Sequence, residues 1–154
     1  MEKLHLISAD TLFYQPLDHP KMLIDGILSN GLAILSGDSK IGKSWMVLWL
    51  CLKISQGEPV WGLPTAQTDV IYLALEDNDW RIQQRMQELI DEPPKNLHFG
   101  FSCGKLGAEL EGQIKGVLED NPNTGLLFID TLQMVRDNVS SRVNAYAQDY
   151  KDLS

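Results

Sequence analysis

The chain has 154 residues and a mass of 17.3 kDa, which is the size of one ordinary domain. Hydrophobic residues make up 44% of the sequence and charged residues 22%, and these proportions exclude a chain that is disordered throughout. The formal net charge of −8 disfavours a dedicated nucleic-acid-binding domain, because such domains normally carry a basic face.

The sequence contains no apolar run of the roughly 18 residues that a membrane-spanning helix needs. Its first residues also lack the longer apolar core of a secretory signal. We therefore expect a cytoplasmic protein with no membrane partner. Cys51 and Cys103 are too few for a disulfide framework or a zinc site, and Cys51 falls in an apolar helical run where packing is its expected role.

Residues 1–31 form an N-terminal lead-in that ends in the turn dipeptide Asn30-Gly31. A short apolar run at 32–36 follows directly, and apolar runs bounded by turn signals are typical of buried strands. Residues 44–55 are apolar nearly all round, which predicts a buried helix.

Strand and helix patterns then alternate towards the C-terminus. The expected strands lie at 70–75, 96–101 and 126–129, and the expected helices at 80–91, 106–119 and 142–153. Asp79 is a suitable N-cap for the first of these helices. The alternation predicts an α/β fold with a largely parallel sheet.

The segment between the first strand and the first helix carries the pattern GxxxxGK[ST], which is the phosphate-binding P-loop. Glycines at both ends let the backbone turn where a side chain would obstruct it, so that the N–H groups can surround phosphate oxygens. The candidate nucleotide-binding residues are Gly37, Asp38, Ser39, Lys40, Ile41, Gly42, Lys43 and Ser44. We assign no role to the side chains of Asp38 and Lys40.

Two residues at the end of this loop carry its chemistry. Lys43 can reach the β- and γ-phosphates with its ammonium group, and Ser44 can offer its hydroxyl to Mg²⁺. A helix that begins here adds the positive end of its dipole at the same point.

Two further strands end in carboxylates. In a parallel sheet, ligands bind beyond the carboxyl ends of the strands, so Asp130 is expected on the same edge as the loop and is our candidate Mg²⁺ ligand. Glu76 follows the strand at 70–75 and is our candidate catalytic base, with Asp77 as the alternate.

Together these segments resemble the RecA-like ATPases, and most closely the RepA-like hexameric helicases of plasmid and phage replication. The resemblance spans nearly the whole chain and includes GDSKIGKSW, VIYLALED and LLFIDTLQ. It implies a RecA-like three-layer α/β/α fold, ATP and Mg²⁺ as ligands, a homo-oligomeric ring and an association with DNA. By the same resemblance Lys43 and Ser44 belong to Walker A, Asp130 to Walker B, and Glu76 is catalytic, while Arg85 matches an arginine of open function.

The chain departs from this family after Asp130. RecA-like folds place another strand between the P-loop strand and the Walker B strand, but only 24 residues follow Asp130 and they resemble a loop and one helix. We therefore expect residues 32–154 to be the N-terminal part of an ATPase domain that is incomplete at its C-terminus. The gap in the sheet could close by direct pairing of 32–36 with 126–129, or by association with a second copy.

Two other functions remain open on the sequence. The chain could be a nucleotide-binding regulatory module without turnover, or a P-loop kinase for a small molecule. The kinase interpretation expects an arginine-bearing lid, and residues 56–67 contain no arginine or lysine. Trp45 and Trp49 are expected in the core, whereas Trp61 or Trp80 could be exposed for base stacking, so DNA binding rests on the resemblance alone.

Overall fold

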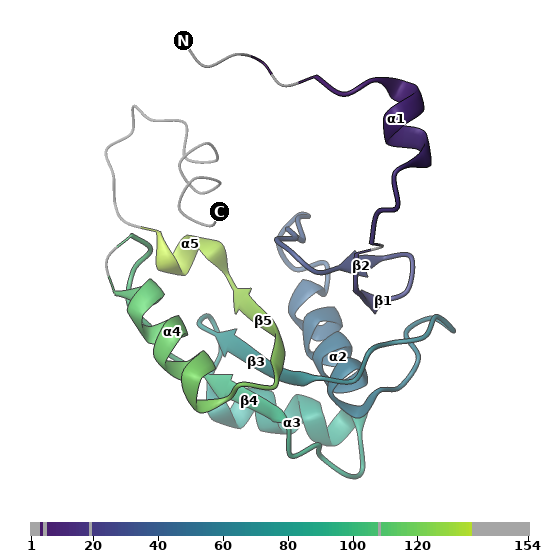
Figure 1. The fold of residues 1–154 in the computed structure, drawn as a ribbon. Coiled ribbons are helices and arrows are strands. Elements are labelled where there is room, and N and C mark those ends of the chain that lie inside the picture. The colour runs from purple at the N-terminus through teal and green to yellow at the C-terminus, as the bar shows by residue number, and fades with distance from the viewer. Residues whose placement is uncertain (1–3, 5, 19, 108, 137–154) are drawn as a thin grey trace.

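The computed structural model describes residues 4, 6–18, 20–107 and 109–136 (Figure 1). In this part of the chain the elements are α1 (Ala9–Tyr14), β1 (Met22–Ile24), β2 (Leu28–Ser29), α2 (Lys43–Gln56), β3 (Asp69–Ala74), α3 (Asp79–Leu89), β4 (Leu97–Gly100), α4 (Leu110–Asp120), β5 (Thr124–Asp130) and α5 (Leu132–Val135). The helix expected at 142–153 lies outside the described residues.

The centre of the fold is a parallel sheet with the strand order β4-β3-β5. The register pairs Ala74, the last residue of β3, with Asp130, the last residue of β5. The carboxyl ends of these two strands therefore lie side by side. The expectation of an α/β fold with a parallel sheet is confirmed for the described residues.

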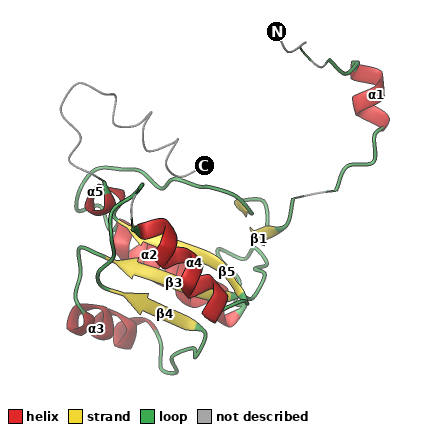
Figure 2. Ribbon diagram, turned by 60° about the vertical axis from the view of Figure 1, so that its left-hand side comes forward, coloured by secondary structure: helices red, strands yellow, loops and turns green. Residues whose placement is uncertain are grey.

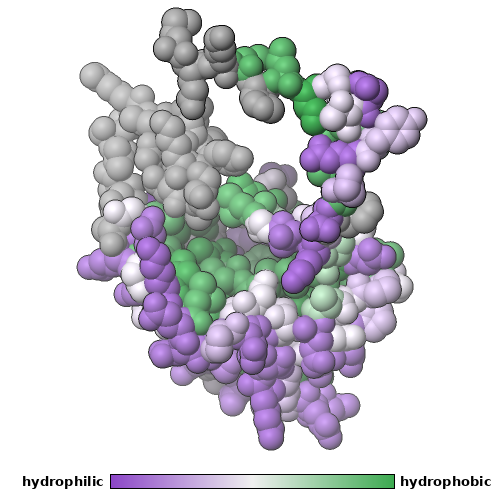
Figure 3. All heavy atoms as spheres, in the orientation of Figure 1, coloured by the Kyte–Doolittle hydropathy of each residue, from purple (hydrophilic) through white to green (hydrophobic). Residues whose placement is uncertain are grey.

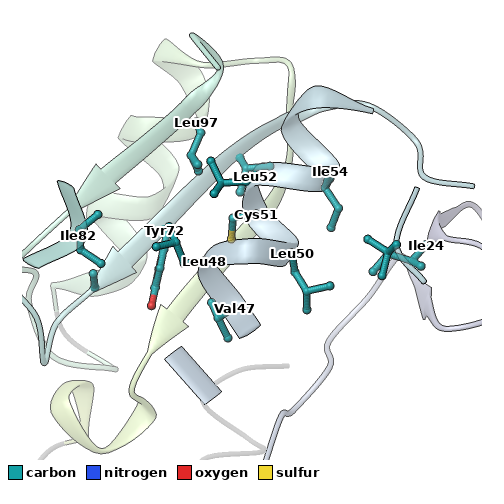
Figure 4. Packing of buried hydrophobic residues seen from close by; sticks show 13 residues of the cluster. Ile24, Val47, Leu48, Leu50, Cys51, Leu52, Ile54, Tyr72, Ile82 and Leu97 are labelled. Carbon is teal, nitrogen blue, oxygen red and sulfur yellow. The ribbon is translucent and has the colours of Figure 1, made fainter. Parts of the chain in front are cut away.

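One face of the sheet is covered by α2 and α3 (Figure 2). Alternate side chains of β3 point to this face, so Val70, Tyr72 and Ala74 join the same core as Leu48 and Ile82. Figure 4 shows the side chains of α2 packed between the sheet and Ile24. Because α2 is apolar nearly all round, it can contact both of these neighbours at once.

The other face is covered by α4 and α5. Leu110 of α4 and Val135 of α5 are fully buried there, and Leu73, Leu75 and Ile129 pack against them. Helices thus lie on both faces of the strands, which is the layered arrangement typical of α/β proteins (Figure 2).

Two helix starts differ from the sequence prediction. The N-cap of α3 is Asn78, whose side-chain oxygen accepts a hydrogen bond from Arg81 N at 2.9 Å, and Asp79 is the first residue of the helix. An asparagine caps a helix as well as an aspartate does, so composition alone did not separate them. α4 begins at Leu110 rather than at residue 106, since Gly107 adopts a positive φ of 77° that is incompatible with a helix.

The strand expected at 32–36 is not formed, and this prediction was wrong. All five residues are exposed and none of them pairs with β5. An extended segment needs a hydrogen-bonding neighbour to be stable in a sheet, and no described strand lies beside it. The direct pairing that would close the gap between 32–36 and β5 is therefore absent from the described part of the chain.

The N-terminal lead-in has two structural parts. β1 and β2 form an antiparallel hairpin that is tied to the body, because Ile24 is buried in the main core and Asp25 N donates to Pro64 O at 3.0 Å. The segment at 4–18, by contrast, leads away from the body, and none of its described residues is buried (Figure 1). We call residues 4–18 the N-terminal arm.

The described residues contain no helix that is both long enough and apolar enough to cross a membrane.

We predict that Leu48→Ala destabilises the fold by about 2–5 kcal/mol, because Leu48 is 0% exposed at the centre of α2 and its loss leaves a cavity. Urea unfolding followed by circular dichroism measures the change. Leu12→Ala is the matched control, since Leu12 lies on the N-terminal arm and is 48% exposed. Equal losses in the two variants would contradict the packing described here.

Candidate functional site

The candidate phosphate-binding loop at 37–42 is exposed along its whole length and leads directly into α2. Gly42 adopts a φ of 93°, which side-chain-bearing residues rarely adopt. A Cβ on Gly37 would lie 2.7 Å from Ile41 Cδ1, which is the end of an exposed side chain that can move aside. The backbone conformation therefore favours glycine at position 42, whereas the contact at position 37 is with a side chain alone.

Lys40 was not expected to have an unusual backbone, but its φ is 64°. The loop therefore contains two residues in the left-handed region, Lys40 and Gly42, within one tight turn. Successive residues of alternating handedness turn backbone N–H groups towards a common centre, which is the geometry of an anion-binding nest.

The N-terminus of α2 is open towards this loop. Its N-cap is Gly42, which offers no side-chain acceptor, and the helix begins at Lys43 and Ser44, both of them half-buried. The first N–H groups of a helix have no partner within the helix, and together with its dipole they favour an anion. α3 differs, since the side chain of Asn78 caps it.

The side chain of Lys43 folds back over the loop. Its Nζ donates hydrogen bonds to Gly37 O at 2.8 Å and to Asp38 O at 2.7 Å. A lysine ammonium has three N–H donors and carries a full positive charge. The side chain thus holds a positive charge at the centre of the loop, where phosphate oxygens could replace the two carbonyl groups.

Asp130 ends β5 and lies against the α2 face of the sheet. Its Oδ2 accepts a hydrogen bond of 2.8 Å from the hydroxyl of Tyr72, whose side chain is buried on that face. Burial raises the pKa of the Cys51 thiol on α2, and the nearby charge of Asp130 raises it further. The carboxylate therefore faces the helix that carries Lys43 and Ser44.

Glu76 and Asp77, which follow β3, have different surroundings. Glu76 is exposed and makes no hydrogen bond or ion pair with any described residue. Asp77 is 10% exposed, and its two carboxylate oxygens lie 3.1 Å from Arg81 Nη1 and 2.5 Å from Arg85 Nη1. Of the two, Glu76 alone has a carboxylate that is available to a ligand.

The end of β3 is connected to the start of α2 through Arg85. The guanidinium carbon of Arg85 lies 5.3 Å from the centre of the Trp45 ring, and Trp45 directly follows Ser44. On the other side, Leu75 N donates to Asp130 O at 2.8 Å. The turn that contains Glu76 is thus linked to Asp130 through Leu75 and to the first turn of α2 through Asp77 and Arg85.

Sequence reasoning missed two residues of this edge. Tyr72 was assigned only to a strand, and Trp45 was expected in the core, although it is 38% exposed and contacts Arg85. A tyrosine two residues before the end of a strand gives no sequence signal of a carboxylate partner 58 positions later. Arg85 was left open on the sequence, and its two partners come from other elements.

The donor chemistry at this edge fits a magnesium ion that is bound with a phosphate ligand. No cluster of three or more His, Cys, Asp or Glu side chains occurs among the described residues, so a site made of protein ligands alone is not found there. Mg²⁺ in phosphate sites needs only one or two protein oxygens, because phosphates and water supply the others. Ser44 and Asp130 offer a hydroxyl and a carboxylate of this kind.

A mostly apolar cavity in the described part of the chain lies elsewhere. It measures about 370 Å³ and is lined by Leu73, Leu110 and Ile114, between α4 and the sheet. None of the candidate site residues lines it. The candidate site is an open edge rather than an enclosed pocket, as expected for a loop that holds phosphates with backbone groups.

The parallel sheet, the loop at 37–42 and the acidic residues at the carboxyl ends of β3 and β5 are typical of the P-loop ATPase class. A family model described as an AAA domain matches residues 2–149, and the chain belongs to this family. The membership supports a nucleotide-binding, ATPase-like core. No curated protein and no solved structure matches the chain.

We predict that Tyr72 makes the stability of the fold sensitive to alkaline pH. Burial, then the hydrogen bond to Asp130 and the charge of Asp130, raises the pKa of the Tyr72 hydroxyl above its usual value of about 10. The folded state keeps this proton when the unfolded chain loses it. The stabilising contribution is therefore complete below pH ~10 and is lost as the pH rises further.

Urea midpoints between about pH 8 and 11 measure this effect. The midpoint of the wild type should fall more steeply above pH ~10 than that of Tyr72→Phe, which lacks the ionising group. Tyr14→Phe serves as control, because Tyr14 is mostly exposed on the N-terminal arm. Parallel curves for wild type and Tyr72→Phe would refute the buried hydroxyl–carboxylate contact.

Proposed function

We propose that this chain is the ATP-binding core of a RecA-like ATPase of the RepA-like branch, which acts in DNA replication or in the maintenance of a mobile element. The observation that carries the proposal is the combination of the Lys43 ammonium, the open N-terminus of α2 and two carboxylates at one edge of a parallel sheet. A polyphosphate matches this arrangement, because its charge is met by N–H groups, a helix dipole and one ammonium.

Each candidate residue has a proposed task at this edge. The loop at 37–42 surrounds the phosphates with backbone N–H groups, and Lys43 exchanges its two carbonyl partners for phosphate oxygens. Ser44 and Asp130 would hold Mg²⁺, which neutralises charge on the phosphates when it is bound. The Tyr72 hydroxyl orients Asp130 and leaves its other carboxylate oxygen available.

Glu76 is the proposed general base for hydrolysis. A base that takes a proton from the attacking water must have a carboxylate free of other partners, and Glu76 meets this requirement among the described residues. Asp77 does not, since both of its oxygens face arginines. The surroundings of the two residues thus favour Glu76 over its alternate.

One observation favours a second candidate function, a nucleotide-binding module without turnover. The residues that precede the loop, 32–36, are exposed and pair with no described strand, so no sheet of the described part of the chain holds this end of the loop. A loop that no strand holds at its first end can bind phosphates, but the alignment that hydrolysis needs is harder to keep. Measurement of ATP turnover by the chain separates the two functions.

The proposed partners are further copies of this chain and DNA. The N-terminal arm supports the first, because it exposes seven large apolar side chains: Leu4, Leu6, Ile7, Leu12, Phe13, Tyr14 and Leu17 (Figure 3). Exposed apolar surface of this extent is typical of a protein–protein contact. The proposal of a ring and of contact with DNA rests on the family resemblance.

We predict that Lys43→Ala weakens ATP binding by roughly 10- to 100-fold, which corresponds to the loss of a charged hydrogen bond of about 1.5–3 kcal/mol. Glu76→Gln should bind MgATP as the wild type does while hydrolysis falls by about 10²- to 10⁴-fold, the contribution of a general base. Isothermal titration calorimetry measures the first effect and phosphate release the second.

Lys115→Ala and Glu119→Gln are the matched controls, because they make similar changes at exposed positions of α4 on the opposite face of the sheet. Both should behave as the wild type. If Glu76→Gln hydrolyses ATP as fast as the wild type does, Glu76 is not the base. If Lys43→Ala binds ATP normally, the loop is not a phosphate site.

We predict that deletion of residues 1–18 shifts the chain towards the monomer, because the deletion removes the apolar side chains of the N-terminal arm. Light scattering coupled to gel filtration, over a range of protein concentrations, measures the mass. Thermal unfolding should remain within a few degrees of the wild type, since no described residue of the deleted segment is buried. A wild-type chain that is monomeric at every concentration would argue against the proposed oligomer.

A further inference from the structure

A cluster of charged and aromatic side chains joins three elements at the candidate site. Asp77 lies in the turn after β3, Arg81 and Arg85 lie on successive turns of α3, and Trp45 lies in the first turn of α2. We call these four residues the clasp. Arg85 is its centre, since it contacts both Asp77 and Trp45.

Arg85 is held more firmly than Arg81. Its side chain is 16% exposed, against 52% for Arg81, and its Nη1 lies 2.5 Å from the Asp77 carboxylate. Its guanidinium also lies over the face of Trp45, where the electron density of the ring attracts a cation. A partly buried guanidinium with a carboxylate on one side and an aromatic ring on the other has little freedom to move.

The clasp also determines the charge next to the loop. One carboxylate and two guanidinium groups leave it with an excess of one positive charge. Without the arginines, Glu76 and Asp77 would present two adjacent negative charges to a polyphosphate and repel it. The arginines therefore permit an acidic residue at position 77 beside a candidate base at position 76.

Glu76 has no side-chain partner among the described residues, so its position depends on its neighbours in the chain. On one side Leu75 N donates to Asp130 O at 2.8 Å, which ties the turn to β5. On the other side Asp77 is tied to Arg85 and through it to Trp45. Glu76 thus lies between an anchor on the β5 side and an anchor on the α2 side.

We propose that Arg85 is a positioning residue that holds the Glu76 turn at a set place relative to the first turn of α2, and so aligns the candidate base with the phosphates bound by Lys43. The effect of this alignment on catalysis rests on the proposed function, because it requires that the chain hydrolyses ATP at this site. The clasp itself is a property of the ligand-free chain and can be tested without ATP.

The first experiment is hydrogen exchange on the full chain without nucleotide. Arg85→Gln should speed exchange in two peptides, one that covers residues 75–78 and one that covers residues 43–50, where hydrogen bonding within α2 begins with Met46 N to Gly42 O. Arg81→Gln is the matched control, because Arg81 pairs with the same carboxylate but is mostly exposed. It should affect the first peptide alone.

A double-mutant comparison then tests the contact between the partners. The urea midpoint of Asp77→Asn/Arg85→Gln should be displaced by less than the sum of the two single displacements, because either single change already breaks the pair. Arg85→Lys should recover part of the exchange protection at 75–78, since it keeps the charge, and little at the start of α2, since it lacks the planar group. Unchanged exchange of the peptide at 43–50 in Arg85→Gln would overturn the proposal.

ATP turnover distinguishes a positioning role of Arg85 from a role in stability alone. Arg85→Gln should lower kcat for ATP by at least tenfold while the dissociation constant for ATP changes by less than about threefold. Arg81→Gln should change kcat much less. Equal falls in kcat for both variants, or a loss of ATP affinity as large as the loss of kcat, would count against positioning by Arg85. A wild-type chain that binds ATP without turnover would refute the proposed hydrolysis instead, and the exchange experiment would still decide on the clasp.

Discussion

The parallel pairing of β3 with β5 is the constraint on which the candidate site depends. Its register places Ala74 beside Asp130, so the strand that leads to Glu76 and the strand that ends in Asp130 stop at the same level. A shift of one residue would turn the side chains of β3 to the opposite face and move Tyr72 away from the Asp130 carboxylate. The burial of Tyr72, Val70 and Ala74 against α2 prevents that shift.

The second constraint is the burial of α2. Its side chains contact the sheet on one side and the β1–β2 hairpin, through Ile24, on the other (Figure 4). A helix that is fixed along its length has a fixed N-terminus, and this is where Lys43 and Ser44 lie. The chemistry of the loop therefore depends on apolar packing more than one turn away from it, although the loop itself is fully exposed.

The three carboxylates around the site differ in whether they have a hydrogen-bonding or ionic partner, and this difference suggests their roles. Asp77 is neutralised by two arginines and Asp130 accepts a hydrogen bond from a buried tyrosine, whereas Glu76 has no described partner. Adjacent acidic residues in the sequence thus acquire different properties from their neighbours in space. The family assignment, an AAA domain over residues 2–149, agrees with an edge organised for a nucleotide.

The sequence by itself determined the P-loop, the alternation of strands and helices and the two acidic strand ends, because these depend on local spacing and on the apolar period along the chain. Only the tertiary structure decided that residues 32–36 lie outside the sheet, since strand formation requires a neighbour that no local pattern reveals. It also decided the partners of Asp130, Asp77 and Arg85, which lie on other elements. Contacts between distant positions arise from packing and register, and for that reason the sequence predicted the elements of this site but not the clasp that joins them.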